Sequence, residues 1–168
     1  NYMNESILRE KAKEFAKIAF DISEKFDTPV LYKMCTRVAH SQSIVETADR
    51  VVQPVKEYKK DPSKYVMAPA NAIRRHPVVE QRLKDIEAWS EISGINRVEM
   101  GGTEIGIITS STCYQYAKEV FGDSVSILKL GMVNPLPKNM ILDFASKVKE
   151  LYVIEELDPI IENYCKSL

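Results

Sequence analysis

Three side chains that could do chemistry follow an apolar run near the start of the chain. Residues 30–34 (Val-Leu-Tyr-Lys-Met) are followed by Arg37, His40 and Ser41. The run predicts a strand that is buried on both faces apart from its lysine and that ends by presenting a cation, a base and a hydroxyl. Because ligands and partner domains meet open α/β sheets at the ends of parallel strands, these side chains are the first candidates for a functional site.

The spacing of these residues limits what they can do. Arg37 and His40 are three positions apart, so in a turn or at a helix start they could face one way and bind a carboxylate or phosphate. Alternatively, they could fasten one domain to the next through carbonyls and carboxylates. His40 and Ser41 are adjacent, which is unsuited to a nucleophile and its base, and no third residue completes a triad. From the residues alone we therefore expect an anion-binding or interdomain role for Arg37 and His40 and no catalytic residue.

The second half of the chain alternates between short apolar runs and amphipathic segments. This alternation predicts strands and helices in turn, with strands over 105–109, 125–130 and 151–154 and helices over 112–121, 138–148 and from Pro159 onward. Asp158 is the expected cap of the last helix. Right-handed crossovers then require an α/β fold with an open, mostly parallel sheet and flanking helices.

A second group of candidates lies where these strands end: Ser110, Ser111, Gly131, Pro135 and Glu155. Parallel strands end at the same edge of a sheet, so we expect these residues to come together. The hydroxyls of Ser110 and Ser111 could hold an anion or simply cap the next helix. The loop with Gly131 and Pro135 could meet a ligand or a neighbouring domain, or only form a rigid connection. Glu155 and the glutamate after it point to opposite faces, so they are not a catalytic pair.

The first hundred residues are less regular. Apolar residues recur every three or four positions over 4–26, which predicts a one-faced helix. A charged stretch with two prolines over 51–64 indicates a surface linker, and the apolar 65–71 an extended docking segment. A second helix is expected over 77–92. The glycine pair 101–102 predicts a two-residue hairpin turn with positive φ.

Composition argues against several classes of partner and cofactor. The 168 residues contain 23 Lys and Arg against 24 Asp and Glu, with no basic block interleaved with aromatic residues, which disfavours nucleic acid. Cys35, Cys113 and Cys165 are far apart, so local spacing builds neither an iron–sulfur cluster nor another metal site. No apolar run approaches the ~20 residues of a membrane span, and no signal peptide opens the chain. We expect a cytoplasmic protein.

Blocks of sequence in a fixed order resemble the alpha subunit of indolepyruvate ferredoxin oxidoreductase, within the 2-oxoacid:ferredoxin oxidoreductase family. The resemblance covers nearly the whole chain after the first helix, and so many ordered blocks make it specific. These blocks are residues 28–31, 36–41, 65–71, 75–78, 106–110, 114–116, 128–131, 135–137 and 153–159.

The resemblance implies a large thiamine diphosphate enzyme of anaerobic metabolism and electron transport. Such an enzyme oxidatively decarboxylates aryl 2-oxoacids such as indolepyruvate, forms acyl-coenzyme A and passes electrons through iron–sulfur clusters to ferredoxin. A beta subunit and the other domains of the same subunit are the implied partners. The resemblance also implies three parts: the tail of a pyrimidine-binding domain (1–50), a linker with a docking segment and helix (51–100), and an incomplete transketolase C-terminal-like domain (101–168).

Several parts of that enzyme are expected to lie outside this chain. These are the glutamate that activates the aminopyrimidine, the Mg²⁺–diphosphate motif and the cysteine-rich ferredoxin-like segment. The chain does not begin with Met and stops just after a helical segment, so we expect a piece of a larger polypeptide that binds no cofactor by itself. The alternative is a free-standing protein-interaction module with a transketolase C-terminal-like fold.

Overall fold

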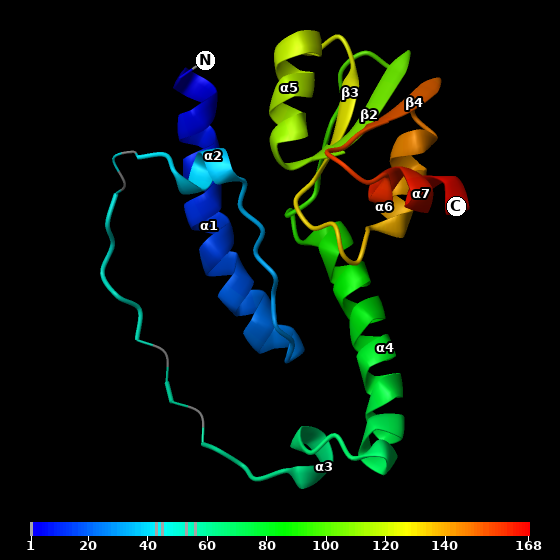
Figure 1. Cartoon of the computed structure of the whole chain (residues 1–168). Helices are drawn as coiled ribbons and strands as arrows, with labels where there is room; N and C mark the ends of the chain where they lie inside the picture. Colours follow the sequence, from blue (N-terminus) through cyan, green and yellow to red (C-terminus); the bar gives the residue numbers. More distant parts are fainter. Residues whose placement is uncertain (1, 43, 45, 53, 56) are drawn as a thin grey trace. The chain divides into compact units, whose positions relative to one another are not determined.

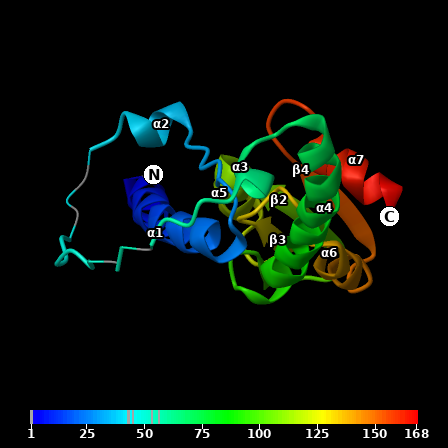
Figure 2. The same cartoon turned by 90° about the horizontal axis from the view of Figure 1, so that it is seen from below.

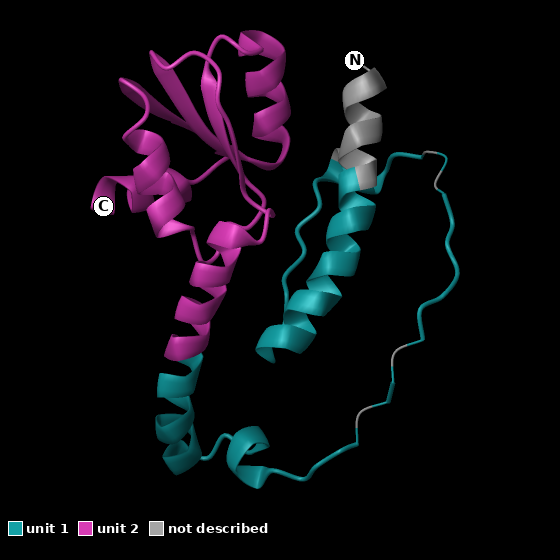
Figure 3. Cartoon of the chain, turned by 180° about the vertical axis from the view of Figure 1, so that it is seen from behind, with its two compact units in different colours: residues 1–79 teal, residues 80–168 magenta. Residues whose placement is uncertain are grey.

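The computed structural model describes the backbone of residues 2–42, 44, 46–52, 54–55 and 57–168, and side chains from residue 11 onward except that of Arg37. The chain divides into two compact units, unit 1 (Asn1–Val79) and unit 2 (Glu80–Leu168), as Figure 3 shows. The division falls within one long helix. None of the helices in the described residues is long and apolar enough to cross a membrane.

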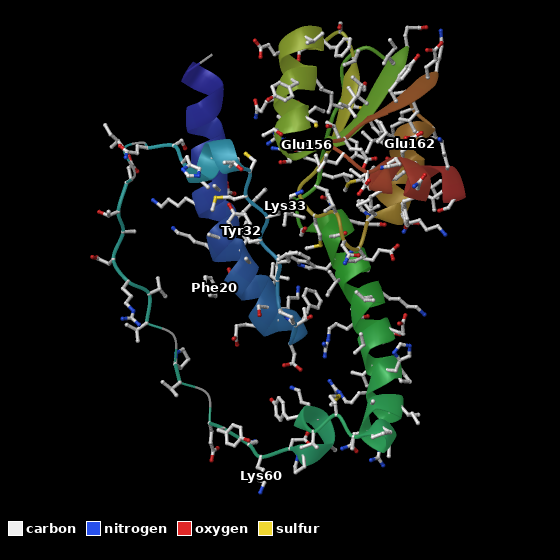
Figure 4. The ribbon with its side chains drawn as sticks, viewed as in Figure 1. Phe20, Tyr32, Lys33, Lys60, Glu156 and Glu162 are labelled. Atoms are coloured by element: carbon white, nitrogen blue, oxygen red, sulfur yellow. The ribbon has the colours of Figure 1, made fainter. Side chains whose placement is uncertain are left out.

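Unit 1 is built from helices and irregular chain: α1 (Tyr2–Phe26), α2 (Thr36–Ala39), α3 (Pro62–Tyr65) and the first part of α4 (Pro69–Ile92). The predicted first helix is confirmed, and its Ile22 is buried. After α1 the chain turns back at Asp27, which has a φ of 51°. The hydroxyl of Tyr32 donates a hydrogen bond to the carbonyl of Ala12 at 2.9 Å, so the returning segment is tied to α1 (Figure 4).

The strand predicted over 30–34 is wrong. This segment has no regular structure, and every strand in the described residues belongs to unit 2. A strand must pair its backbone groups with a neighbouring strand, and the described part of unit 1 offers none. The side chain of Leu31 is accordingly 96% exposed. Arg37, His40 and Ser41 therefore follow an irregular segment and not the end of a strand.

The middle of the chain matches the predictions in part. The described residues of 51–61 form neither helix nor strand, as expected of a linker, but the last three residues of the predicted 51–64 linker belong to α3. The docking segment expected over 65–71 is shorter, because α3 ends at Tyr65 and α4 begins at Pro69. Helix α4 thus starts well before the predicted residue 77 and runs through Pro77. A proline inside a helix removes one hydrogen bond, here to the carbonyl of the exposed Ile73, where water can replace it.

Unit 2 contains one sheet of four strands: β1 (Arg97–Glu99), β2 (Ile105–Ser110), β3 (Ser126–Leu130) and β4 (Glu150–Ile154). The spatial order is β1-β3-β2-β4, with β2 parallel to both β3 and β4 and β1 antiparallel to β3. The predicted α/β class with an open, mostly parallel sheet and flanking helices is confirmed.

The hairpin predicted at the glycine pair is wrong, because β1 pairs with β3 and not with β2. Gly101 and Gly102 lie in the connection that passes the start of β3, and neither has a positive φ. A Cβ atom on Gly102 would lie 2.2 Å from the carbonyl oxygen of Ser124, and one on Gly101 would lie 2.4 Å from that of Asp123. The glycines are needed for close approach of two backbones, which a sequence does not distinguish from a tight turn.

Helices cover both faces of the sheet (Figures 1 and 2). Helix α5 (Ser111–Phe121) packs on one face, and α6 (Lys138–Ala145) and α7 (Ile160–Ser167) pack on the other. The core under α5 is Ile107, Tyr114, Ala117, Val125 and Ile127. The core under α6 and α7 is Ile108, Leu128, Leu130, Leu136, Ile141, Phe144 and Ile161. These layers fix where the strand ends and their loops lie.

Candidate functional site

The three parallel strands end at one edge of the sheet, called the carboxyl edge below. Residue Ser110 of β2 is paired with Leu130 of β3, and Thr109 is paired with Ile154 of β4. The turn at Ser110 and Ser111, the loop that starts at Gly131 and the residue Glu155 therefore follow neighbouring strands. The strand order brings these candidates to one edge as expected, and their part in a functional site stays a prediction.

The carboxylate of Glu155 caps helix α7. Its Oε1 accepts the backbone N–H groups of Ile160 at 2.9 Å and Ile161 at 3.1 Å, and its Oε2 accepts that of Glu162 at 2.9 Å. The first N–H groups of a helix have no partner within the helix and carry partial positive charge, which a carboxylate stabilises. The expected cap, Asp158, contributes only its backbone carbonyl, to Ile160. Glu155 is thus a structural carboxylate.

Helix α6 is capped in the same way from a distant segment. Glu91, near the end of α4, accepts the backbone N–H of Asn139 through Oε1 at 2.8 Å and the Asn139 side-chain amide through Oε2 at 3.1 Å. This contact joins residues 48 positions apart. No local pattern in the sequence predicts it, because the capping residue does not precede the helix that it caps.

Helix α5 begins without a side-chain cap, so the predicted capping by Ser110 or Ser111 is wrong. Ser111 has a φ of 52°, and the neighbouring Thr109 hydroxyl donates to the carbonyl of Ile154 at 2.7 Å. Burial, followed by the negative charges of Glu156 and Glu155, raises the pKa of the Cys113 thiol in the first turn. The negative charges of Glu156 and Glu155 therefore act on this helix start as well, and they disfavour a bound anion.

The side-chain amide of Asn96 holds the loop after β3. Asn96 is buried, and its Oδ1 accepts the backbone N–H groups of Gly131 at 2.9 Å and Met132 at 3.0 Å. Its Nδ2 donates to the carbonyl of Ser90 at 3.3 Å. A Cβ atom on Gly131 would lie 2.2 Å from the carbonyl oxygen of Ile95, so only glycine fits there. The role of Asn96 could not be predicted from the sequence, because an isolated Asn between a helix and a strand has no distinguishing pattern.

A half-buried polar network lies on the face of the sheet that α5 covers. The hydroxyl of Tyr114 donates to Glu99 Oε1 at 2.8 Å and accepts from Arg97 Nη2 at 3.0 Å. Lys118 Nζ lies 3.4 Å from Glu99 Oε2, and Lys129 Nζ lies 4.5 Å from the centre of the Tyr114 ring. Burial raises the pKa of Glu99, but the Tyr114 hydroxyl, Arg97 and Lys118 outweigh it and hold that pKa below its ordinary value. The network fastens β1 and α5 together.

The first candidates lie in unit 1, around helix α2. The hydroxyl of Ser41 donates a hydrogen bond to the carbonyl of Val38 at 2.8 Å, at the end of α2. The hydroxyl proton of Ser41 is therefore already engaged. His40 is exposed and follows the last helical residue. The side chain of Arg37 lies outside the described residues. The predicted pairing of Arg37 with His40 stays a prediction.

The described side chains do not fit a metal ion or a diphosphate. Among them, no three His, Cys, Asp or Glu residues lie close enough to hold a metal, and the three cysteines are free and separate. The N-termini of α6 and α7, which could otherwise receive phosphate oxygens, are occupied by Glu91 and Glu155. Two of the three helix starts in this unit are therefore capped from within the chain, and that of α5 is not.

Comparison with curated proteins shows relatives along almost the whole chain. The chain is 33% identical over 165 residues to the indolepyruvate oxidoreductase subunit IorA of Archaeoglobus fulgidus, which covers 95% of this chain and 26% of that subunit. It is 36% identical over 155 residues to the subunit IorA of Methanothermobacter thermautotrophicus, which covers 89% of this chain and 25% of that subunit. The chain belongs to the IorA family. It spans about a quarter of the length of these relatives.

Two further comparisons add little to the IorA assignment. No profile of a known protein family matches the chain. A solved 2-oxoglutarate:ferredoxin oxidoreductase from Magnetococcus marinus, with 2-oxoglutarate, coenzyme A and succinyl-CoA bound, is 19% identical with a TM-score of 0.44. That similarity covers 60% of this chain and 19% of the solved chain, and it is too weak to support a functional assignment.

Proposed function

We propose that this chain is a structural and interdomain segment of an IorA-type subunit. The full-length enzyme would oxidatively decarboxylate aryl 2-oxoacids such as indolepyruvate, form acyl-coenzyme A and reduce ferredoxin. The observation that supports this most is the similarity to IorA subunits over 89–95% of the chain. Arg37, His40 and Ser41 would contact the substrate or the neighbouring domain in that enzyme.

A structural role for the segment itself is supported by the carboxyl edge. Two of its three helix starts are occupied by carboxylates of the same chain, Glu91 and Glu155, and the third lies near Glu156. Thiamine diphosphate with Mg²⁺ and the iron–sulfur clusters would then be held by other parts of the full-length subunit or by its partner subunit. The loops at the carboxyl edge would then contact those parts.

The test compares the 168-residue chain with the full-length subunit that contains it, purified together with its partner subunit under anaerobic conditions. Thiamine diphosphate and Mg²⁺ are titrated into each by calorimetry, and indolepyruvate-dependent ferredoxin reduction is measured in the presence of coenzyme A. We expect binding and turnover only with the full-length enzyme. Micromolar cofactor binding by the isolated chain would contradict the structural role, and an inactive full-length enzyme would contradict the proposed reaction.

A further inference from the structure

A groove in unit 2 lies beside the loop that follows β3. It has a volume of about 470 Å³ and is formed by the second half of α4, residues 133–136 and helix α7. Leu136 is buried in it, whereas Val133 and Ile160 are 46% and 65% exposed. Volumes of this size are typical of sites for small ligands or for a few residues of a peptide. The groove is therefore large enough for an occupant and partly apolar.

Four polar side chains line this groove without partners. Among the described residues, neither the Glu87 carboxylate nor the Tyr164 hydroxyl has a hydrogen bond or an ion pair, and the same holds for the amides of Asn134 and Asn163. Glu87 and Tyr164 are half-buried, where polar groups normally find partners from the protein, from water or from a ligand, whereas Asn134 and Asn163 are exposed. A few convergent polar groups on an apolar surface are typical of a recognition site.

The charge of the groove is negative. Glu87 is a lining residue, and no Lys or Arg lines the groove. Burial, followed by the charges of Glu87, Cys165 and Glu91, raises the pKa of the Tyr164 hydroxyl, which places two carboxylates close to that ring. The Glu91 carboxylate is already engaged by Asn139, so Glu87 is the one available for an outside cation. Electrostatic complementarity therefore favours an occupant with a positive charge.

The remaining lining groups indicate the form of that occupant. An Asn side chain carries both a donor and an acceptor, which match the N–H and C=O groups of an extended peptide. Asn134 and Asn163 lie on two different walls of the groove, the loop and helix α7. Val133 and Ile160 offer exposed aliphatic surface beside them. A peptide with one cationic side chain between aliphatic ones satisfies all of these groups together.

We propose that this groove docks an extended peptide segment of a neighbouring polypeptide of the enzyme, with a Lys or Arg side chain paired to Glu87 and aliphatic side chains on Val133 and Ile160. The identity of the neighbour rests on the proposed function, because an IorA-type enzyme supplies other domains and subunits. The charge and polarity of the groove, from which the peptide is inferred, do not depend on the proposed function.

The test uses the full 168-residue chain, labelled with ¹⁵N, and the capped tripeptide acetyl-Val-Arg-Val-amide as the probe. We expect saturable shifts of the backbone resonances of Val133, Ile160, Asn163 and Tyr164. The same peptide with citrulline, a neutral analogue of arginine, should bind about fivefold more weakly, because one ion pair at a partly exposed site is worth up to about that factor. Glu87→Gln should cause the same loss with the arginine peptide, whereas Glu119→Gln on the exposed face of α5 should cause none.

Three outcomes would overturn the proposal. The first is that no resonance around the groove moves, and the second is that the arginine and citrulline peptides bind equally well. The third is that butylguanidine alone binds as tightly as the tripeptide, which would assign the groove to a small amine-like ligand. Because the titration needs no enzymatic activity, its result is independent of whether the full-length enzyme turns over indolepyruvate.

Discussion

The two units differ in how much of their apolar surface they bury and in how they pair their polar groups. Unit 2 buries two apolar cores and caps the starts of α6 and α7 with its own carboxylates, Glu91 and Glu155. In the described part of unit 1, Ile22 is the single buried hydrophobic residue, whereas Leu31 and Val55 are 96% and 98% exposed. Unit 1 is held by isolated polar contacts, such as the bond from Tyr32 to Ala12 and the 2.6 Å ion pair between Lys64 and Asp27.

This difference indicates which unit depends on outside contacts. Burying one large aliphatic side chain stabilises the folded state by about 1.5–3 kcal/mol. The exposed aliphatic side chains of unit 1 do not provide this stabilisation. Unit 2 obtains this stabilisation from its own buried side chains. We infer that unit 2 can hold its fold alone, while unit 1 depends on contacts that cover its exposed apolar side chains. The following predictions test that contrast, from the largest expected effect to the smallest.

Truncating one core side chain should show the difference in packing between the two units most clearly. Phe144 belongs to α6 and is fully buried in the core that this helix covers, so Phe144→Ala leaves a cavity and should lower the free energy of unfolding of unit 2 by about 3–5 kcal/mol. Leu31→Ala should change stability by less than about 0.5 kcal/mol, because its side chain is already in water. Urea unfolding followed by circular dichroism measures both variants. Similar losses from the two substitutions would show that unit 1 is packed as tightly as unit 2.

Removing the cap of α7 should have an intermediate effect. Glu155→Ala leaves three backbone N–H groups without their carboxylate and should cost about 1–2 kcal/mol. The matched control is Glu156→Ala, whose side chain is exposed and makes no such bonds among the described residues. Thermal unfolding of both variants gives the comparison. A Glu156→Ala loss as large as that of Glu155→Ala would show that general charge, and not the cap, stabilises this edge.

The sequence predicts most of unit 2 because its patterns are local. Each strand between 105 and 154 is a short apolar run, and each helix between them repeats its apolar residues on one side, so both periods are visible. The parallel arrangement then follows because a helix between two strands returns the chain to the end of the sheet where the first strand began. Gly122 also ends α5 as its conformational freedom predicts, with a φ of 57°.

The errors have a different physical origin. The apolar run 30–34 has the composition of a strand, but a strand also needs a partner, which composition cannot report. The glycines 101 and 102 serve a close approach to Asp123 and Ser124, more than twenty positions away in the sequence. The caps by Glu91 and Glu155 come from residues that do not adjoin their helices. In the candidate site, the positions of the strand ends could thus be predicted from the sequence. The carboxylates that cap the helices after these strands could not.

The smallest expected effect concerns Glu99 in the network around Tyr114. Although burial raises the pKa of Glu99, the hydrogen bond from Tyr114 and the charges of Arg97 and Lys118 lower it more, so its folded value lies below its unfolded value of about 4.3. A lowered folded pKa contributes stability that is present above the unfolded pKa and is lost as the pH falls through the folded pKa. Glu99→Gln should therefore cost about 1 kcal/mol at pH 7.

The difference between the parent chain and Glu99→Gln should shrink as the pH falls below the unfolded value of about 4.3, and it should disappear once the pH is below the lowered folded pKa, because the protonated carboxyl and the amide are then both neutral. Urea unfolding at a series of pH values measures this dependence. The control is Glu104→Gln, which removes an exposed ion pair with Lys149 and should cost less than about 0.5 kcal/mol at any pH. If the two variants behaved alike, the polar groups of unit 2 would be no better satisfied than an exposed surface pair, and the contrast with unit 1 would rest on apolar burial alone.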